Sequence, residues 1–96
     1  MINVKVHSIL GIKKILGKGK LEVAMPSGSD LEALITRLVR DYGDALSTYL
    51  YGAEGQNILP HIRLMINGRD IEFLHGLKTD LHDGDEVLIL PPISGG

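Results

Sequence analysis

The fold is decided by one stretch near the C-terminus, DGDEVLILPP, which occupies residues 83–92. Its first two residues are a typical turn pair, and the run 86–90 that follows the next aspartate is almost entirely apolar. Such a run predicts a central strand that is buried on both faces of a sheet. The two prolines then end the strand, because proline has no N–H to donate to a neighbouring strand.

A hairpin is predicted immediately upstream of this stretch. Apolar and polar residues alternate over residues 62–66, and the pair Asn67-Gly68 follows, which is the strongest short hairpin signal. We expect residues 70–73 to form a short return strand after this turn. The hairpin therefore contributes a third and a fourth strand.

Two more strands are predicted at the N-terminus. Residues 2–7 and 20–25 each alternate with a period of two, as half-buried strands do, and Pro26 stops the second one. Between them, residues 12–16 have the apolar spacing of one short helical turn, bracketed by Gly11 and Gly17. The two strands can therefore form a hairpin-like unit.

The main helix is predicted to begin at Ser29. The sequence from Ser29 to Glu32 matches a capping box, in which the Ser29 hydroxyl accepts from the Glu32 N–H while the Glu32 carboxylate accepts from the Ser29 N–H. Gly43 is expected to end the helix in a left-handed conformation. An apolar stripe at helical spacing marks its inner face: Leu31, Leu34, Ile35, Leu38 and Val39.

A second short helix is predicted over residues 44–51, with Leu46, Tyr49 and Leu50 facing inward. The complete element order predicts an α+β domain, with a mixed sheet of about five strands and one main helix packed across it. We expect residues 1–96 to be a single domain, because 96 residues are too few for two cores. Residues 91–96 are expected to form an extended, flexible C-terminal tail.

Composition excludes several classes of function. The chain has no cysteine, which rules out disulfides, cysteine-ligated zinc and a cysteine nucleophile. The net charge of −2 and the 4% aromatic content argue against nucleic acid as a ligand. No signal peptide or membrane-length apolar stretch is present, so we expect a cytoplasmic protein without a membrane partner. The acidic excess lies in residues 49–96, which carry −4 against +2 for residues 1–48.

Side-chain chemistry finds no candidate site. The four histidines have no metal-binding spacing and are expected at the surface or at strand ends. The acidic residues of 80–86 lack the ligand pattern of a calcium loop and are expected to serve turns and solvation. Residues 17–20, GKGK, lack the context of a phosphate-binding loop, and no serine has a nucleophile motif. We therefore expect this chain to bind no metal or cofactor.

The end of the chain, LPPISGG at residues 90–96, is the remaining candidate. A buried strand ends there, two prolines stiffen the exit, and Gly95 and Gly96 are small enough to thread a narrow tunnel. The terminal carboxylate of Gly96 is then the one reactive group presented. A carboxylate becomes an acyl donor only after activation, for example by adenylation with ATP, which this chain has no residues to perform. A partner must therefore activate the tail.

The residues 83–87 and 90–96, supported by the capped helix and the hairpin at Asn67-Gly68, resemble the MoaD/ThiS family of ubiquitin-like sulfur carriers. Within that family the chain resembles most the small subunit of molybdopterin synthase. The resemblance implies the ubiquitin-like β-grasp fold, which agrees with the predicted element order. The family pattern departs in two places: residues 49–60 are longer than in compact members, and Leu90 stands where an aromatic residue is often found.

The resemblance also implies a mechanism in which the chain is a carrier subunit and not an enzyme by itself. An E1-like adenylyltransferase of the MoeB/ThiF type would use ATP to adenylate the carboxylate of Gly96, and a sulfur donor system would convert it to a thiocarboxylate. The tail would then insert into a molybdopterin synthase large subunit of the MoaE type and give its sulfur to a pterin precursor. By the same matching, Gly96 with Gly95 is the reactive end, and five residues contact the partner: Leu90, Pro91, Pro92, Ile93 and Ser94.

Three alternatives use the same tail or the same fold. The chain can be a related sulfur carrier for thiamin, tRNA thiolation or cysteine synthesis. It can be a ubiquitin-like modifier, whose activated Gly96 forms an isopeptide bond with a lysine of another protein. It can also be an interaction module whose tail is incidental. The sequence alone does not separate the first two from the molybdopterin carrier.

Overall fold

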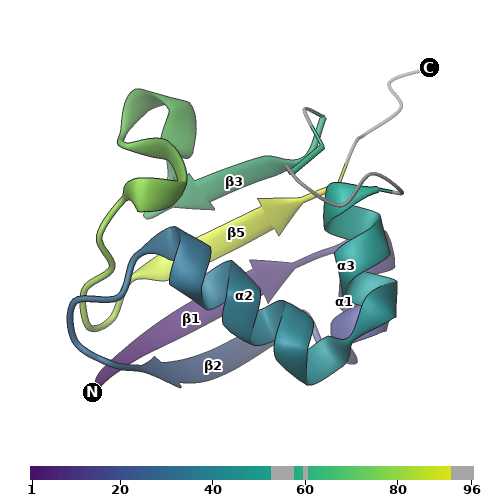
Figure 1. The fold of residues 1–96 in the computed structure, drawn as a ribbon, viewed down its shortest axis with the longest axis horizontal. Helices are drawn as coiled ribbons and strands as arrows, with labels where there is room; N and C mark the ends of the chain where they lie inside the picture. Colours follow the sequence, from purple (N-terminus) through teal and green to yellow (C-terminus); the bar gives the residue numbers. More distant parts are fainter. Residues whose placement is uncertain (53–57, 60, 92–96) are drawn as a thin grey trace.

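The computed structural model describes residues 1–52, 58–59 and 61–91. Within these residues the chain forms one five-stranded sheet accompanied by three α-helices (Figure 1). The elements in chain order are β1 (Ile2–Ser8), α1 (Leu10–Leu16), β2 (Lys20–Met25), α2 (Leu31–Tyr42), α3 (Asp44–Tyr51), β3 (Arg63–Ile66), β4 (Arg69–Asp70), the 3₁₀ turns η1 (Ile71–Phe73) and η2 (Gly76–Lys78), and β5 (Glu86–Leu90).

The sheet is mixed, with the strand order β2-β1-β5-β3-β4. β5 lies in the centre, parallel to β1 and antiparallel to β3, while the two outer pairs are antiparallel hairpin partners. The prediction that residues 86–90 form a central strand is therefore confirmed. This strand is the last element of the described residues, so the chain reaches Pro91 from the middle of the sheet.

The prediction that this strand is buried on both faces is wrong. Along β5, Val87 and Ile89 are buried, whereas Leu88 and Leu90 are only half-buried. The register places Val6 beside Val87 and Leu64 beside Ile89, so the inner side chains of three strands share one face and pack under the helices. The opposite face, which we call the open face, carries half-buried and exposed side chains. An apolar run in a central strand thus does not require that both faces of the sheet are covered.

Helix α2 lies across the inner face of the sheet (Figure 1). Its predicted stripe is confirmed, since Leu31, Leu34, Ile35 and Leu38 are buried while Val39 is half-buried. The predicted capping box is wrong. The N-cap is Asp30, whose carboxylate accepts from the Ala33 N–H at 2.9 Å.

Neither member of the expected capping box makes its expected contact. The Ser29 hydroxyl donates instead to the Pro26 carbonyl at 2.7 Å, and the Glu32 carboxylate accepts from Nζ of Lys78 at 2.8 Å. The reason is tertiary: the Leu31 N–H donates to the Thr79 carbonyl and the Ser29 carbonyl accepts from the Leu81 N–H. These bonds fix the backbone before the helix, so that Asp30 takes the cap position.

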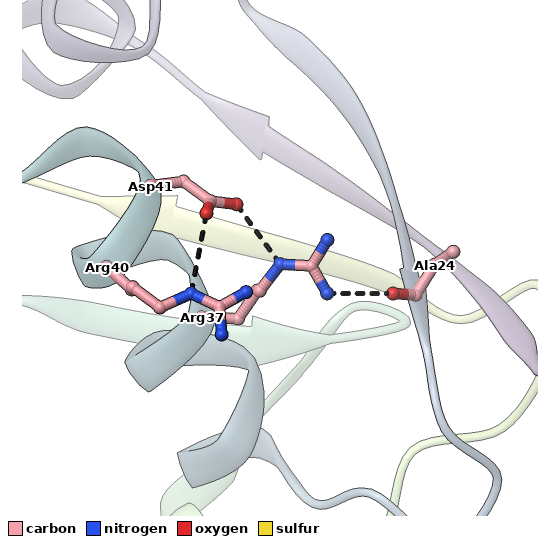
Figure 2. A network of polar contacts seen from close by, with 4 residues as sticks. All are labelled: Ala24, Arg37, Arg40 and Asp41. Atoms are coloured by element: carbon pink, nitrogen blue, oxygen red, sulfur yellow. Dashed lines mark hydrogen bonds and ion pairs between the residues drawn. The ribbon is translucent and has the colours of Figure 1, made fainter.

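Figure 2 shows how α2 is fastened to the edge of the sheet. Arg37 donates from one terminal nitrogen to the Ala24 carbonyl of β2 at 3.3 Å, and its Nε donates to Asp41 at 3.1 Å. The second carboxylate oxygen of Asp41 lies 3.7 Å from Nε of Arg40. Because β2 is an edge strand, the Arg37 contact also occupies a backbone carbonyl that would otherwise be open to pairing.

Gly43 separates α2 from α3. Its φ of 75° confirms a positive φ, but its ψ of −154° lies outside the left-handed helical region that the sequence predicts. This combination is accessible essentially to glycine alone. The predicted inner residues of α3 hold in part, since Leu46 and Leu50 are buried and Tyr49 is half-buried.

The hairpin between β3 and β4 turns at Asn67-Gly68, as predicted, and both residues have positive φ. The predicted return strand over residues 70–73 is wrong beyond Asp70. The Asp70 carboxylate accepts from the Glu72 N–H at 2.9 Å and starts the 3₁₀ turn η1. A local side-chain bond has replaced the strand.

Candidate activation and docking site

The site begins where β5 reaches the end of the sheet. Ile89 pairs with Ser8 on one side and Leu64 on the other, and Leu90 pairs with Arg63. These neighbours hold the last residues of β5 in the centre of the sheet. A central strand is therefore the rigid base from which the C-terminal segment starts.

The structure describes two of the seven predicted site residues. Leu90 is half-buried on the open face, and Pro91, the next residue, is buried against the protein. The other five predicted residues lie outside the described residues: Pro92, Ile93, Ser94, Gly95 and Gly96. Most of the loop within 49–60 also lies outside them, while Tyr49 and Tyr51 belong to α3.

The start of β5 is fixed to both neighbouring strands. The Asn3 N–H donates to the Asp83 carboxylate at 2.7 Å, and the Gly84 N–H donates back to the Asn3 carbonyl at 2.8 Å. On the other side, the Asn67 amide donates to Asp85 and accepts from the Glu86 N–H, both at 2.9 Å. The acidic residues here serve the turn, as the sequence analysis expects.

The open face carries an apolar centre that the sequence analysis did not identify as a site. Leu88 pairs with His7 of β1 and with Met65 of β3, so these three side chains form one row across the face. Leu90 lies two residues further along β5, toward the C-terminal segment. The available signal was Met65, an apolar residue at an outward position of an alternating strand.

A histidine–carboxylate contact and an ion pair border this apolar centre. His7 Nε2 lies 2.9 Å from a carboxylate oxygen of Glu86, and a terminal nitrogen of Arg63 lies 2.7 Å from Asp70. The side chain of Asp70 is 12% exposed, whereas that of Arg63 is 67% exposed. An apolar centre with a polar rim is the usual composition of a protein interface.

Two groups outside the open face have displaced pKa values. The hydrogen bond from Lys78 to Glu32 raises the pKa of Lys78, and burial raises the pKa of Tyr51, with the charge of Glu32 adding to the effect. The Lys78 ion pair connects η2 with α2, far apart in the sequence. These shifts accompany structural contacts and do not belong to the docking surface.

Within the described residues, no three histidine, aspartate or glutamate side chains come together as metal ligands. Over the same residues, no helix is long and apolar enough to cross a bilayer. The described part of the candidate site is therefore a surface, made of the end of β5 and the open face around Leu88.

Comparison with known sequences identifies the family. The ThiS family pattern matches residues 11–96. A protein of Archaeoglobus fulgidus, provisionally named as a sulfur carrier, is 31% identical over 86 residues, covering 79% of this chain and 98% of its own length. The sulfur carrier protein CysO of Mycobacterium tuberculosis is 31% identical over 70 residues, covering 73% and 75%. Small archaeal modifier protein 3 of Haloferax volcanii is 42% identical over 43 residues, 45% of this chain and 47% of that protein.

Solved structures agree with this result. Small archaeal modifier protein 1 of Methanosarcina acetivorans superimposes with a TM-score of 0.82 at 33% identity, covering 100% of this chain and 98% of that one. A Pyrococcus furiosus protein provisionally named molybdopterin converting factor subunit 1 has a TM-score of 0.70 at 21% identity, with 97% and 100% covered, and shows the fold alone. The fold is the ubiquitin-like β-grasp, and the chain belongs to the ThiS/MoaD family of ubiquitin-like sulfur carriers.

Proposed function

We propose that the carboxylate of Gly96 is the reactive group of this chain and that it carries sulfur as a thiocarboxylate. A carboxylate oxygen attacks the α-phosphorus of ATP on an E1-like adenylyltransferase of the MoeB/ThiF type, and pyrophosphate leaves. A sulfide-level sulfur from a donor system then attacks the acyl carbon, and AMP leaves. The chain supplies the acyl group, and its partners supply the nucleotide and the sulfur.

The observation that carries the proposal is the match of the ThiS family to residues 11–96, a range that includes the terminal Gly95-Gly96. The fold adds a physical reason for the position of the reactive group. β5 is the central strand and the last element described. A partner that binds the sheet therefore also fixes Leu90, from which the tail starts. A rigid base reduces the entropy lost when a short tail enters an active site.

The open face is the surface that we assign to these partners. Met65, Leu88 and Leu90 lie in its centre, and Leu90 leads directly to Pro91. A partner that covers this face therefore meets the start of the tail without crossing the helices. Apolar side chains at the centre of such a patch are expected to supply most of the binding free energy.

For the sulfur acceptor we place the pterin precursor of molybdopterin first, with this chain as the carrier subunit beside a large subunit of the MoaE type. The support is the resemblance carried by residues 83–87 and 90–96, including the two prolines before the tail. We place this chemistry in the cytoplasm, where ATP is available. Cysteine synthesis is the neighbouring alternative, because CysO is among the relatives. Incubating the thiocarboxylated chain with each acceptor enzyme and its substrate decides between them, since one of the two mixtures should consume the thiocarboxylate.

A protein-modifier role is the second candidate function. It is favoured by the 33% identity to the archaeal modifier of Methanosarcina acetivorans, which extends over the whole of this chain. In this role the activated Gly96 reacts with a lysine amine, and AMP or a partner thiol leaves. Mass spectrometry of trypsin-digested cell protein tests it, because modified lysines would carry branched remnants of this chain's C-terminus.

Carrier-dependent exchange of pyrophosphate into ATP tests the first step of the proposed function. The E1-like enzyme of the source organism, ATP and labelled pyrophosphate should exchange label only when the chain is added. Removing Gly96 should abolish exchange, while circular dichroism should show an unchanged fold, since the described sheet and helices are built without Gly96. Undiminished exchange with the shortened chain would contradict the proposal.

A further inference from the structure

An apolar and basic corner lies between β1 and β2, and nothing in the proposed chemistry uses it so far. We define this N-terminal corner as Ile9, Leu10, Lys13, Lys14 and Gly17. Ile9 is 39% exposed and Leu10 is 61% exposed. An open depression of about 560 Å³ is lined by Leu10, Lys13, Lys14 and Gly17.

Leu10 is held in a conformation that disfavours it. Its φ is 54°, in the left-handed region where glycine and asparagine are tolerated far better than leucine. The fold gains little in return, because the side chain points largely into solvent. An exposed apolar residue that is also strained is better explained by a contact made with another molecule than by stability.

The charge of this region is opposite to that of the rest of the chain. Residues 10–20 contain four lysines and no acidic residue, so they carry +4, and since the whole chain carries −2 the remainder carries −6. Among the described residues, no carboxylate lies within 4 Å of Lys13, Lys14, Lys18 or Lys20. The lysines therefore present a local positive field that suits an acidic partner surface.

The corner lies at the end of the sheet from which the tail leaves. β1 and β5 are parallel, and their last paired residues are Ser8 and Ile89. Ile9 and Leu10 therefore follow β1 at the same end of the sheet at which β5 ends and Pro91 follows. In Figure 1, α1 lies behind α3 at the end of the sheet toward which the arrows of β1 and β5 point, in agreement with this register.

We propose that the N-terminal corner is a second docking point for the enzyme that adenylates the tail, and that this enzyme presents an apolar socket bordered by aspartate or glutamate side chains. The inference rests on the proposed function and names a contact of that same site. Leu10 enters the socket, and Lys13 and Lys14 face the carboxylates. The corner follows β1 at the same end of the sheet at which β5 leads into Pro91, which is why we assign it to the adenylating enzyme and not to a second copy of this chain.

The double variant Leu10→Asn with Lys14→Glu tests the proposal. Asparagine suits the φ of position 10 better than leucine does, so this variant should unfold at an equal or higher temperature than the parent protein. It should nevertheless raise the KM for the chain at least about tenfold in ATP–pyrophosphate exchange with the E1-like enzyme, while kcat stays within about twofold. The KM of the parent should also rise with ionic strength more steeply than that of the variant.

The matched control is Phe73→Asn with Arg69→Glu, which makes the same kinds of change at the other edge of the sheet. Phe73 is 84% exposed, and Arg69 is exposed in β4. This control should leave KM within about twofold of the parent, because it lies away from the proposed contact. Equal effects of the two double variants would overturn the proposal, and so would an unchanged KM for the Leu10/Lys14 variant.

The same experiments distinguish a failure of the proposed function from a failure of the corner contact. If the parent chain supports no exchange at all, the proposed function itself fails and this inference fails with it. If exchange is normal in both double variants, the proposed function stands and only the corner contact is wrong. If the parent elutes as a dimer on size exclusion and the Leu10/Lys14 variant as a monomer, with equal KM, the corner binds a second copy instead and the proposal is overturned.

Discussion

Gly11 of α1 lies against the ring of Tyr49 of α3, so closely that a Cβ atom at position 11 would stand 2.8 Å from ring carbon Cε2 and 2.9 Å from the hydroxyl oxygen. These two helices are joined through a position that has room only for hydrogen. Tyr49 is half-buried and packs against the core. The contact explains why a glycine is found inside a helix, where alanine would ordinarily be preferred.

Replacing Gly11 with alanine should therefore destabilise the protein despite the better helix propensity of alanine. We expect a loss of about 1–3 kcal/mol in the free energy of unfolding, because the ring of Tyr49 must move out of its packed position. In a Tyr49→Ala background the same substitution should instead stabilise by up to about 1 kcal/mol. Urea unfolding of the four proteins of this cycle measures the coupling.

Gly17→Ala is the control for that cycle. Gly17 has a φ of 84° and open space around it, so its substitution should cost stability through backbone strain alone. That cost should be the same with and without Tyr49. If Gly11→Ala were also insensitive to Tyr49, the close contact between the two helices would be refuted.

The cap of α2 can be tested by exchanging its two candidate residues separately. Asp30→Ala should lower the free energy of unfolding by about 1 kcal/mol, because the Ala33 N–H loses its acceptor. Ser29→Ala should cost less, since the Ser29 hydroxyl donates to the Pro26 carbonyl outside the helix. Thermal unfolding would contradict this assignment if the serine variant were the less stable of the two.

Local sequence patterns predicted most of the helices and strands. They failed where contacts with residues distant in the sequence determine the local structure. Alternation and helical spacing located the strands and α2, because those patterns reflect a face turned toward the core. The choice between Ser29 and Asp30 as cap depends on backbone bonds to Thr79 and Leu81, about 50 residues away. No local pattern carries that information.

The same limit applies to the candidate site. The terminal Gly95-Gly96 and the strand before it are visible in the sequence. The open face is not, because an apolar run such as residues 86–90 looks the same whether one or two faces are covered. The N-terminal corner is not visible either, because the pattern of residues 12–16 indicates only a short helical turn, while the strained φ of Leu10 is a property of the backbone.

The side chain of Asn67 should stabilise the hairpin beyond the effect of its turn conformation. Asn67→Gly keeps the positive φ but removes the two bonds to Asp85 and to the Glu86 N–H. We expect a loss of about 1–3 kcal/mol in the free energy of unfolding. Asn67→Ala should lose more, because alanine also disfavours the conformation, and equal losses in urea unfolding would argue against the conformational part.

A substitution at Leu88 tests docking through the open face separately from the stability of the fold. Leu88→Ser should raise the KM for the chain in ATP–pyrophosphate exchange by about tenfold or more, because it removes an apolar anchor from the centre of the patch. Ala24→Ser, on the same face at the edge strand β2, should have little effect and serves as control. An unchanged KM for the Leu88 variant, with the fold intact, would remove the open face from the interface.

The central claim is that sulfur resides on the main-chain carboxylate of Gly96. Its most direct test is intact mass spectrometry after incubation with the E1-like enzyme, ATP and a sulfur donor, followed by fragmentation to locate the change. The account predicts a mass increase equal to the replacement of one oxygen by one sulfur, confined to the C-terminal residue and absent without ATP. Once adenylation has been demonstrated, a mass that stays unchanged in the presence of the sulfur donor would contradict the account. A modification located elsewhere in the chain would contradict it as well.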